Sequence, residues 1–142
     1  MDEISLLVKL APTKSTHQSA LRVMRRRDGG FFVGKYDRSE VKQWSALFSM
    51  SIRKHAPETP WDCPTEAEIY LFFPWPKSIS KKQKEKHSWK TTKPDLDNSE
   101  KAILDCLTEE GFIKDDSIIC SKKSQKFFSD EPKVLIVLRK IT

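Results

Sequence analysis

The sequence predicts a single α+β domain over residues 1–142, with a mixed β-sheet of about four to five strands and two main helices. The chain of 142 residues has the length of one ordinary domain. Two segments repeat apolar residues at spacings of three and four, which is typical of helices packed on a core. Short apolar segments near both ends of the chain, bounded by turn residues, predict strands.

A strand and a hairpin are predicted at the start of the chain. Apolar residues alternate with polar or neutral ones from Leu6 to Leu10 and stop before Pro12, which predicts a strand that runs into a loop. Residues 21–26 and 31–33 predict the two arms of the hairpin. Asp28-Gly29-Gly30 supplies its turn, because glycine adopts positive φ without a steric cost.

A helix followed by a strand is predicted in the middle of the chain. Ser39 is the candidate N-cap of a helix that continues to about His55. The prolines and short polar residues from Pro57 to Pro64 break this helix. The apolar segment from Ala67 to Phe73 then predicts the strand, which Pro74 ends. The residues of the helix that recur at helical spacing are Val41, Trp44, Phe48 and Ile52.

The second half of the chain predicts a loop, a helix and two strands. Residues 77–92 show no convincing periodicity, which predicts a long, irregular, lysine-rich loop. A helix capped by Asp97 or Asn98 continues through Glu110 and is stopped by Gly111. Residues 118–119 and 134–138 predict two strands, and the second of them is apolar on both faces, as is typical of a strand inside a sheet. The residues of the helix expected to face the core are Ile103, Leu104 and Leu107.

Basic residues dominate two segments of the chain. The 26 Lys and Arg residues against 20 Asp and Glu give a formal net charge of +6. Residues 9–27 contain basic residues and no acidic one, and residues 77–93 contain seven lysines against Glu85 alone. This distribution predicts a nucleic-acid interface, with an anionic membrane surface as the weaker alternative, because no amphipathic helix is predicted there.

The cysteines indicate neither a disulfide framework nor a zinc site. Cys63, Cys106 and Cys120 are odd in number and far apart, without C-x-x-C spacing. The chain has no positive region at its start and no apolar run of roughly 20 residues, so that neither export nor membrane insertion is expected. We therefore expect a reducing, cytoplasmic setting.

Acidic residues gather near residue 96 in an otherwise basic chain. Asp95 and Asp97 are two apart in a segment that Pro94 is expected to hold extended, so that their side chains point to the same side. Lys101 lies one helical turn after Asp97 on the same face. Because carboxylates are oxygen ligands for Mg²⁺, the pattern predicts a metal site beside a fixed positive charge. Taken alone, the two aspartates also fit a helix N-cap.

Asp115 and Asp116 reach this site only if the chain turns back. A helix of about twelve residues carries the backbone roughly 18 Å away from Asp97. The six residues up to Asp116 span about 20 Å when extended. Return within one subunit therefore requires an immediate reversal at Gly111, and the alternative is a site completed by another subunit. Seen in isolation, the two residues also fit a polar turn before a strand.

Together these residues resemble the signature of the RusA family of Holliday junction resolvases. That signature is K-P-D-x-D-N, a lysine four residues after the second aspartate, then D-x-L and D-D. The resemblance extends from Leu6 to the C-terminal strand, and one departure is Ser99, where the family usually has leucine. The matching residues are Lys93, Pro94, Asp95, Asp97, Asn98, Lys101, Asp105, Leu107, Asp115 and Asp116.

The resemblance implies a Mg²⁺-dependent endonuclease, with Mn²⁺ as an alternative ion, that acts as a homodimer and nicks two strands symmetrically across a four-way DNA junction. Asp95, Asp97 and Asp116 would be metal-binding catalytic residues. Asp115 would be a supporting metal-binding acid, and Lys101 would be catalytic by stabilising charge on the phosphate. Because such proteins are common in phages and prophages, the resemblance implies the cytoplasm of a bacterial or phage-infected cell.

The predicted DNA contacts lie in the two basic segments. The lysines are expected to follow the phosphate backbone, and Trp89 is expected to stack on an unpaired base at the junction centre. Two alternatives remain open: a DNA-binding recombination accessory protein without activity, and a nuclease for other branched DNA such as forks or flaps. The candidate DNA-binding residues are Lys77, Lys81, Lys82, Lys84, Lys86, Trp89, Lys90, Lys93, Arg25, Arg26 and Arg27.

Overall fold

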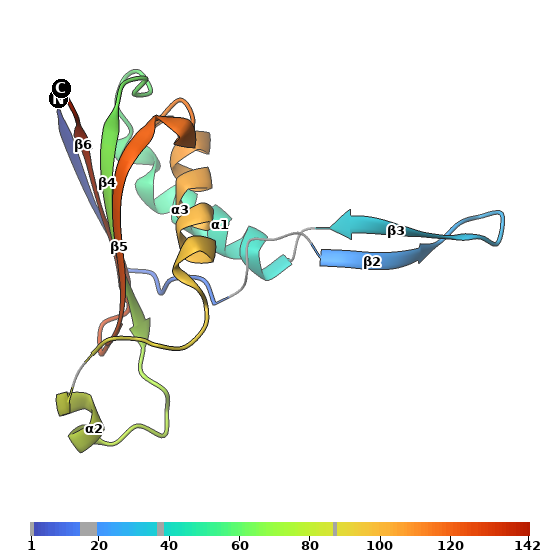
Figure 1. Ribbon diagram of the computed structural model, residues 1–142, viewed down its shortest axis with the longest axis horizontal. Helices are drawn as coiled ribbons and strands as arrows, with labels where there is room; N and C mark the ends of the chain where they lie inside the picture. The colour runs from blue at the N-terminus through green and yellow to red at the C-terminus, as the bar shows by residue number, and fades with distance from the viewer. Residues whose placement is uncertain (1, 15–19, 37–38, 87) are drawn as a thin grey trace.

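A mixed sheet with two helices on one face forms the body of the protein in a computed structural model of the chain (Figure 1). The structure describes residues 2–14, 20–36, 39–86 and 88–142, and it describes the side chains of these residues except 20–24, 32–36, 39, 85 and 86. The four strands lie in the order β1-β6-β4-β5. Strand β6 is antiparallel to β1 and to β4, whereas β4 and β5 are parallel. The bounds are Glu3–Val8 for β1, Thr65–Pro74 for β4, Ile119–Ser129 for β5 and Lys133–Lys140 for β6.

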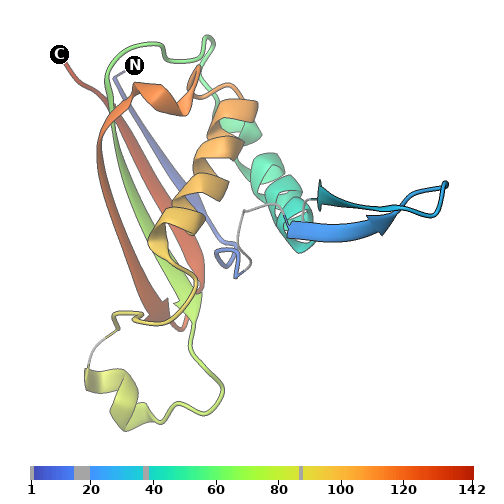
Figure 2. The same cartoon turned by 45° about the vertical axis from the view of Figure 1, so that its right-hand side comes forward.

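Both main helices pack on the same face of this sheet (Figures 1 and 2). Helix α1 spans Ser39–Ile52 and continues into the 3-10 turn η1, Arg53–His55, while α3 spans Leu96–Glu109. The predicted α+β fold with a mixed sheet and two main helices is confirmed. No helix within the described ranges is long and apolar enough to cross a membrane.

The core lies between the helices and the sheet. Side chains on a strand alternate between its two faces, so that every second residue of β1, β4 and β6 is buried under the helices. From α1, Trp44 and Phe48 stack with ring centroids 4.8 Å apart, and the indole Nε1–H of Trp44 donates a hydrogen bond of 2.8 Å to the Ala11 carbonyl. The α3 residues predicted to face the core are all buried: Ile103, Leu104 and Leu107.

Two strand predictions need correction, and one is confirmed. Strand β1 runs over residues 3–8 and not 6–10, because its ladder with β6 starts at Glu3. Strand β5 is far longer than residues 118–119 and includes a polar stretch. It lies at the sheet edge, where polar side chains are tolerated, and it pairs with β4 along its length. Strand β6 lies inside the sheet, as its apolar sequence predicts.

The predicted hairpin forms a separate two-stranded arm that projects from the body (Figure 1). Its strands are β2, Ala20–Arg25, and β3, Phe31–Tyr36. Gly29 adopts a φ of 92°, and the Arg26 N–H donates a hydrogen bond of 2.6 Å to the Gly30 carbonyl, which closes the turn. The arm therefore presents its loop, residues 26–30, at the far end from the sheet.

A short helix interrupts the segment predicted to be an irregular loop. Helix α2 spans Lys81–Lys86. Its start is a capping box, because the Gln83 N–H donates to Ser80 Oγ at 3.2 Å and the Ser80 N–H donates to Gln83 Oε1 at 3.1 Å. The S-x-x-Q sequence that forms this box is a local helix signal, which the absence of apolar periodicity obscures.

Candidate active site

The first acidic pair lies at the N-terminus of α3. Asp95 is the N-cap residue, with φ −71° and ψ 149°, and Asp97 already belongs to the first helical turn. The Lys93-Pro94 peptide bond that precedes them is cis. The expectation that both aspartates lie in one extended segment is therefore wrong, and so is the prediction that Asp97 or Asn98 caps the helix, because the N-cap is Asp95. The helix begins immediately after Asp95, and the period-two rule for extended chains does not apply to Asp97.

The Asp95 carboxylate is not used to cap the helix. Its side chain makes no capping hydrogen bond, although aspartate at this position commonly does so. Its described ionic contact is with Lys93, whose Nζ lies 3.4 Å from Asp95 Oδ2, and both side chains are largely exposed. A carboxylate in this position keeps its oxygens accessible to a ligand from solvent.

The chain reverses directly after α3, as the length argument requires. Gly111 has a φ of 80°, and the Phe112 N–H donates a hydrogen bond of 2.9 Å to the Leu107 carbonyl. The Phe112 carbonyl in turn accepts a hydrogen bond of 3.0 Å from the Trp61 N–H. The chain then enters the 3-10 turn η2, Asp116–Ile118, beside α3. The predicted reversal at Gly111 is confirmed within one chain.

Replacement of Gly111 tests how strongly this reversal depends on a left-handed backbone. A Cβ at this position would meet only Pro60 Cγ, at an ordinary 3.9 Å, so that the cost of Gly111→Ala is conformational. We expect a loss of about 1–2 kcal/mol in the free energy of unfolding, measured by urea denaturation. Gly111→Asn should lose less, because asparagine tolerates positive φ better. An unchanged stability of the alanine variant would contradict this reading.

Lys101 links α3 to the returning chain. Its Nζ lies 2.9 Å from Asp105 Oδ1 one turn along α3, and 3.3 Å from Asp116 Oδ2 on η2. The hydrogen bond from Lys101 to Asp105, together with that to Asp116, raises the pKa of Lys101. The side chain therefore stays a positively charged ammonium between two carboxylates, and it places Asp116 next to the helix that carries Asp97.

Asp115 has a structural role at the start of η2. Its Oδ2 accepts a hydrogen bond of 3.1 Å from the Ser117 N–H, as an N-cap does. Hydrogen bonds from the hydroxyl and backbone of Ser117 lower the pKa of Asp115. The capping-turn alternative thus describes Asp115 well, and Asp116 is the residue that turns toward α3.

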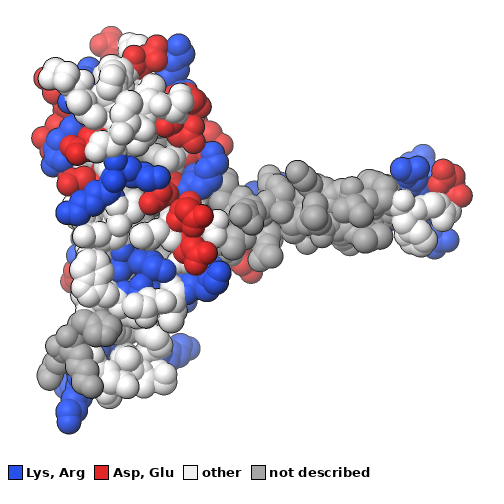
Figure 3. Space-filling view, viewed as in Figure 1, with Lys and Arg blue, Asp and Glu red and all other residues white. Residues whose placement is uncertain are grey.

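The donor set fits a hard divalent cation in its chemistry, but it is not gathered into one cluster. Within residues 2–14, 20–36, 39–86 and 88–142, no three His, Cys, Asp or Glu side chains are placed to hold a metal ion together. The structure joins Asp116 to Lys101 and Asp95 to Lys93, while the carboxylates on the two segments remain separate. On the face of the molecule drawn in Figure 3, red acidic atoms lie near the middle of the body, with blue basic atoms above and below them.

Several of the predicted DNA contacts are engaged within the protein. Lys84 forms an ion pair of 3.0 Å with Asp130. Lys90 lies over the Phe128 ring, 4.7 Å from its centroid, and its partial burial lowers its pKa. The Trp89 ring packs on Phe127 with centroids 4.6 Å apart, although 50% of the residue is still exposed. The basic residues predicted to bind DNA whose side chains are exposed are Arg25, Arg26, Arg27, Lys77, Lys81, Lys82 and Lys93, and the Lys86 side chain is outside the described part.

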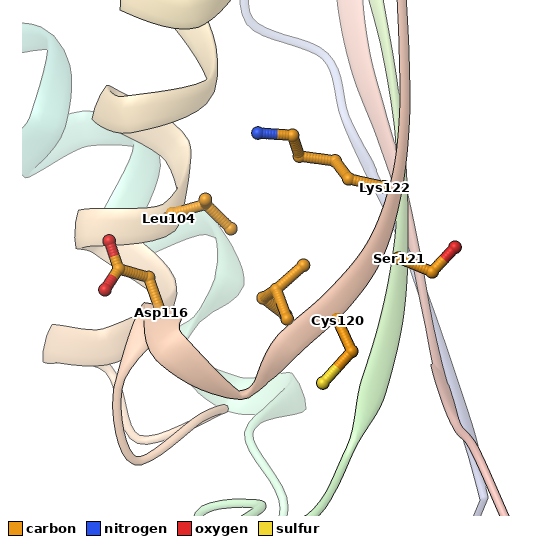
Figure 4. Close-up of a pocket in the computed structure, with 6 residues that line it drawn as sticks. Leu104, Asp116, Cys120, Ser121 and Lys122 are labelled. Carbon is orange, nitrogen blue, oxygen red and sulfur yellow. The ribbon is translucent and has the colours of Figure 1, made fainter.

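Sequence reasoning missed two lysines of β5 that face the helices. Lys122 forms an ion pair with Glu100 of α3, and Lys126 donates hydrogen bonds to the segment that precedes Asp95. Neither residue has a sequence signal, because their roles depend on a polar strand whose register only the fold defines. Figure 4 shows Lys122 reaching from β5 toward α3, whereas Ser121 points to the opposite side of the sheet.

A small open cavity lies beside Lys122 of β5 and Asp116 of η2. Its volume is about 230 Å³. Asp116 and Lys122 give it one acidic and one basic side chain, and Leu104 forms part of its apolar wall (Figure 4). Its remaining lining residues are Ile119, Cys120 and Ser121.

Comparisons with known proteins define the class. A family model described as "Endodeoxyribonuclease RusA" matches residues 12–139, nearly the whole chain. The class is therefore that of nucleases that cut within DNA strands. The chain belongs to the RusA endodeoxyribonuclease family, whose members act on branched DNA. It is also similar to the "Uncharacterized protein YqaN" of Bacillus subtilis (strain 168), with 32% identity over 112 residues that cover 75% of this chain and 78% of that protein.

Proposed function

We propose that this protein is a Mg²⁺-dependent, structure-selective endonuclease that resolves four-way DNA junctions by paired, symmetric nicks. The family match over residues 12–139 supports nuclease activity. The observation that carries the site assignment is Lys101, whose ammonium links Asp116 of the returning chain to the helix that begins with Asp95 and Asp97. Lys101 and Asp116 therefore lie in contact, and Asp95 and Asp97 lie at the start of the helix that carries Lys101.

The chemistry follows from the residue types. Asp95, Asp97 and Asp116 would hold Mg²⁺, or Mn²⁺ as an alternative, with Asp115 in support. When bound, such an ion lowers the pKa of a water molecule and neutralises charge on the phosphate. Lys101 keeps its proton, because Asp105 and Asp116 raise its pKa, and it would offset the negative charge that develops on the phosphate oxygens. Asp105 orients this ammonium from one helical turn away.

A homodimer suits the proposed reaction. A four-way junction presents two equivalent strands related by a two-fold axis, and a two-fold dimer presents two equivalent active sites. Light scattering at the working concentration should report a mass of two chains. A stable monomer under conditions that allow cleavage would contradict paired nicking by a dimer.

The tip of the hairpin arm supplies a prediction about DNA affinity. Arg25, Arg26 and Arg27 are exposed there. Neutralising all three with glutamine should weaken junction binding and reduce the slope of log K against log salt by about 2–3, because each phosphate contact contributes about 0.9 to that slope. Fluorescence anisotropy with a labelled junction over a range of salt concentrations measures both quantities.

A matched triple variant separates local contact from total charge. Lys42, Lys54 and Lys123 are exposed lysines outside the proposed interface. Replacing these three with glutamine removes the same charge and should leave the slope nearly unchanged. Equal slopes for the two triple variants would show that the arm makes no specific phosphate contact.

One assay separates the proposed activity from its alternatives. Wild-type protein is incubated with labelled four-way junction, fork, flap and linear duplex, with Mg²⁺ or with EDTA. The proposal requires Mg²⁺-dependent cleavage of the junction in preference to the other substrates. Binding without cleavage would favour a recombination accessory protein, and equal cleavage of forks or flaps would favour a broader branched-DNA nuclease.

A further inference from the structure

The segment that leads into Asp95 is attached to the edge strand of the sheet. The Lys90 N–H donates a hydrogen bond of 3.1 Å to the Lys126 carbonyl, and the Phe128 N–H donates one of 2.6 Å to the Ser88 carbonyl. Between them, Trp89 forms an isolated antiparallel bridge with Phe127. Residues 88–90 thus extend the sheet beyond β5, and the chain runs from this edge to the start of α3 in only five more residues.

Lys126 holds the last part of this segment by its side chain. Its Nζ donates hydrogen bonds of 2.7 Å to the Thr92 carbonyl and 2.7 Å to the Pro94 carbonyl. Such bonds from an ammonium are stronger than those between neutral groups. Lys126 lies opposite the buried Leu71 in the register of β4 and β5, which directs its side chain to the helix-covered face, and Pro94 is itself buried.

The bond to Pro94 acts directly on the position of Asp95. The Pro94 carbonyl and the Asp95 N–H belong to one planar peptide unit. A hydrogen bond that fixes the carbonyl therefore also fixes the orientation of the Asp95 backbone N–H. Asp95 makes no side-chain capping bond that would hold its carboxylate from the helix side. Lys126 therefore supplies a restraint on this residue that the helix itself does not supply.

We propose that Lys126 is a positioning residue of the nuclease site, which acts through the Thr92 and Pro94 carbonyls to hold Asp95 in the orientation needed for metal binding. This inference rests on the proposed function for its catalytic consequence. Its structural part, a restraint on residues 91–97, is independent of the reaction. The competing role for an ammonium at this place is a direct contact with a DNA phosphate.

Three variants of β5 test the proposal. Lys126→Met removes the charge and the donors but keeps the length of the side chain, and Lys126→Arg keeps charge and donors. Lys123→Met is the matched control, because Lys123 lies three residues earlier, opposite Glu68, and is exposed. Thermal unfolding of all three variants identifies any that does not fold, and in that case Lys126→Gln takes the place of Lys126→Met.

The first readout is hydrogen exchange of the peptide that covers residues 91–99, which requires no cleavage. The proposal predicts at least about tenfold faster exchange there in Lys126→Met, since a charge-assisted hydrogen bond changes an opening equilibrium by that factor or more. Lys123→Met should exchange as the wild type does, and Lys126→Arg should lie close to it. Unchanged exchange in Lys126→Met would overturn the proposal, whether or not the protein cleaves DNA.

The second readout is nicking of a four-way junction at saturating DNA as Mg²⁺ is varied. Lys126→Met should need several-fold more Mg²⁺ for half-maximal rate and should lose about tenfold or more in kcat, with a KM for DNA close to that of the wild type. A raised KM with unchanged kcat and Mg²⁺ dependence would instead identify a phosphate contact and overturn the positioning role. If wild-type protein shows no nicking while exchange responds as predicted, the proposed function fails and the restraint stands.

Discussion

Asp97→Asn and Asp116→Asn should each lower the Mg²⁺-dependent nicking rate of a four-way junction by about 10³-fold or more, with junction affinity changed by less than about threefold. Asparagine keeps the size of aspartate but removes the charge that a divalent cation requires, and a factor of 10³ corresponds to about 4 kcal/mol in the barrier. Affinity should persist because we expect it to depend on the lysines and arginines predicted to contact phosphates. Single-turnover cleavage and anisotropy of the same labelled junction measure the two effects.

The matched control for these variants is Asp62→Asn. Asp62 is an exposed aspartate that pairs with Lys114 at 3.1 Å, outside the signature residues. It should keep wild-type activity, because an exposed ion pair contributes little to stability and this one takes no part in the proposed site. Wild-type cleavage rates in both Asp97→Asn and Asp116→Asn would remove these residues from the mechanism.

Phe112→Ala should destabilise the fold by about 3–5 kcal/mol and lower the melting temperature by roughly 10–15 °C. Phe112 is fully buried in the reversal that follows α3, and its backbone bonds to Leu107 and Trp61 hold that reversal in place. Loss of its ring would leave a cavity at the point where the chain turns back toward Lys101. Calorimetry or urea denaturation measures the change.

The control for this prediction is another phenylalanine. Phe31 is 68% exposed on the hairpin arm, so that Phe31→Ala should change the free energy of unfolding by no more than about 0.5 kcal/mol. Comparable losses in the two variants would mean that Phe112 does not have the packing role its burial indicates. Because the reversal places Asp116, Phe112→Ala should also reduce nicking below its melting temperature.

The parts of the fold that follow strong local rules could be predicted from the sequence. The apolar spacing in α1 and α3 and the Asp28-Gly29-Gly30 turn have local causes, and the structure contains each of these elements. The reversal at Gly111 is one of two arrangements that the chain length allows, the other being a site completed by another subunit, and the structure contains the reversal. The ion pair between Lys101 and Asp116 is the contact that such a return makes possible.

Other features depend on tertiary contacts that the sequence does not display. Strand β5 is polar over much of its length, and its strand structure comes from pairing with β4 at the sheet edge. The bonds from Lys126 to Thr92 and Pro94 join residues more than thirty positions apart. Such a contact has no local pattern, so that one lysine in K-K-S-Q-K cannot be distinguished from its neighbours before the register of the strand is known.

Part of the lysine-rich segment packs on the protein itself, which limits the DNA contacts predicted from its composition. Lys84, Trp89 and Lys90 all contact other parts of the protein, because the chain folds back along β5 before it reaches Asp95. Their DNA-binding role remains a prediction. It requires that the exposed half of Trp89 and the ammonium groups of Lys84 and Lys90 contact DNA without losing their contacts within the protein. The exposed side chains of Lys77, Lys81 and Lys82 carry no such condition, whereas Lys93 pairs with Asp95.

Cleavage of a supercoiled plasmid that extrudes a cruciform is the decisive test of Mg²⁺-dependent, paired nicking by this protein. Paired nicks within one bound complex convert the plasmid to linear DNA, whereas independent nicks first yield open circles. We expect linear product with Mg²⁺, nicks at symmetric positions across the junction, and no product with EDTA. Open circles alone, or equal cleavage of a matched plasmid without the cruciform, would contradict it.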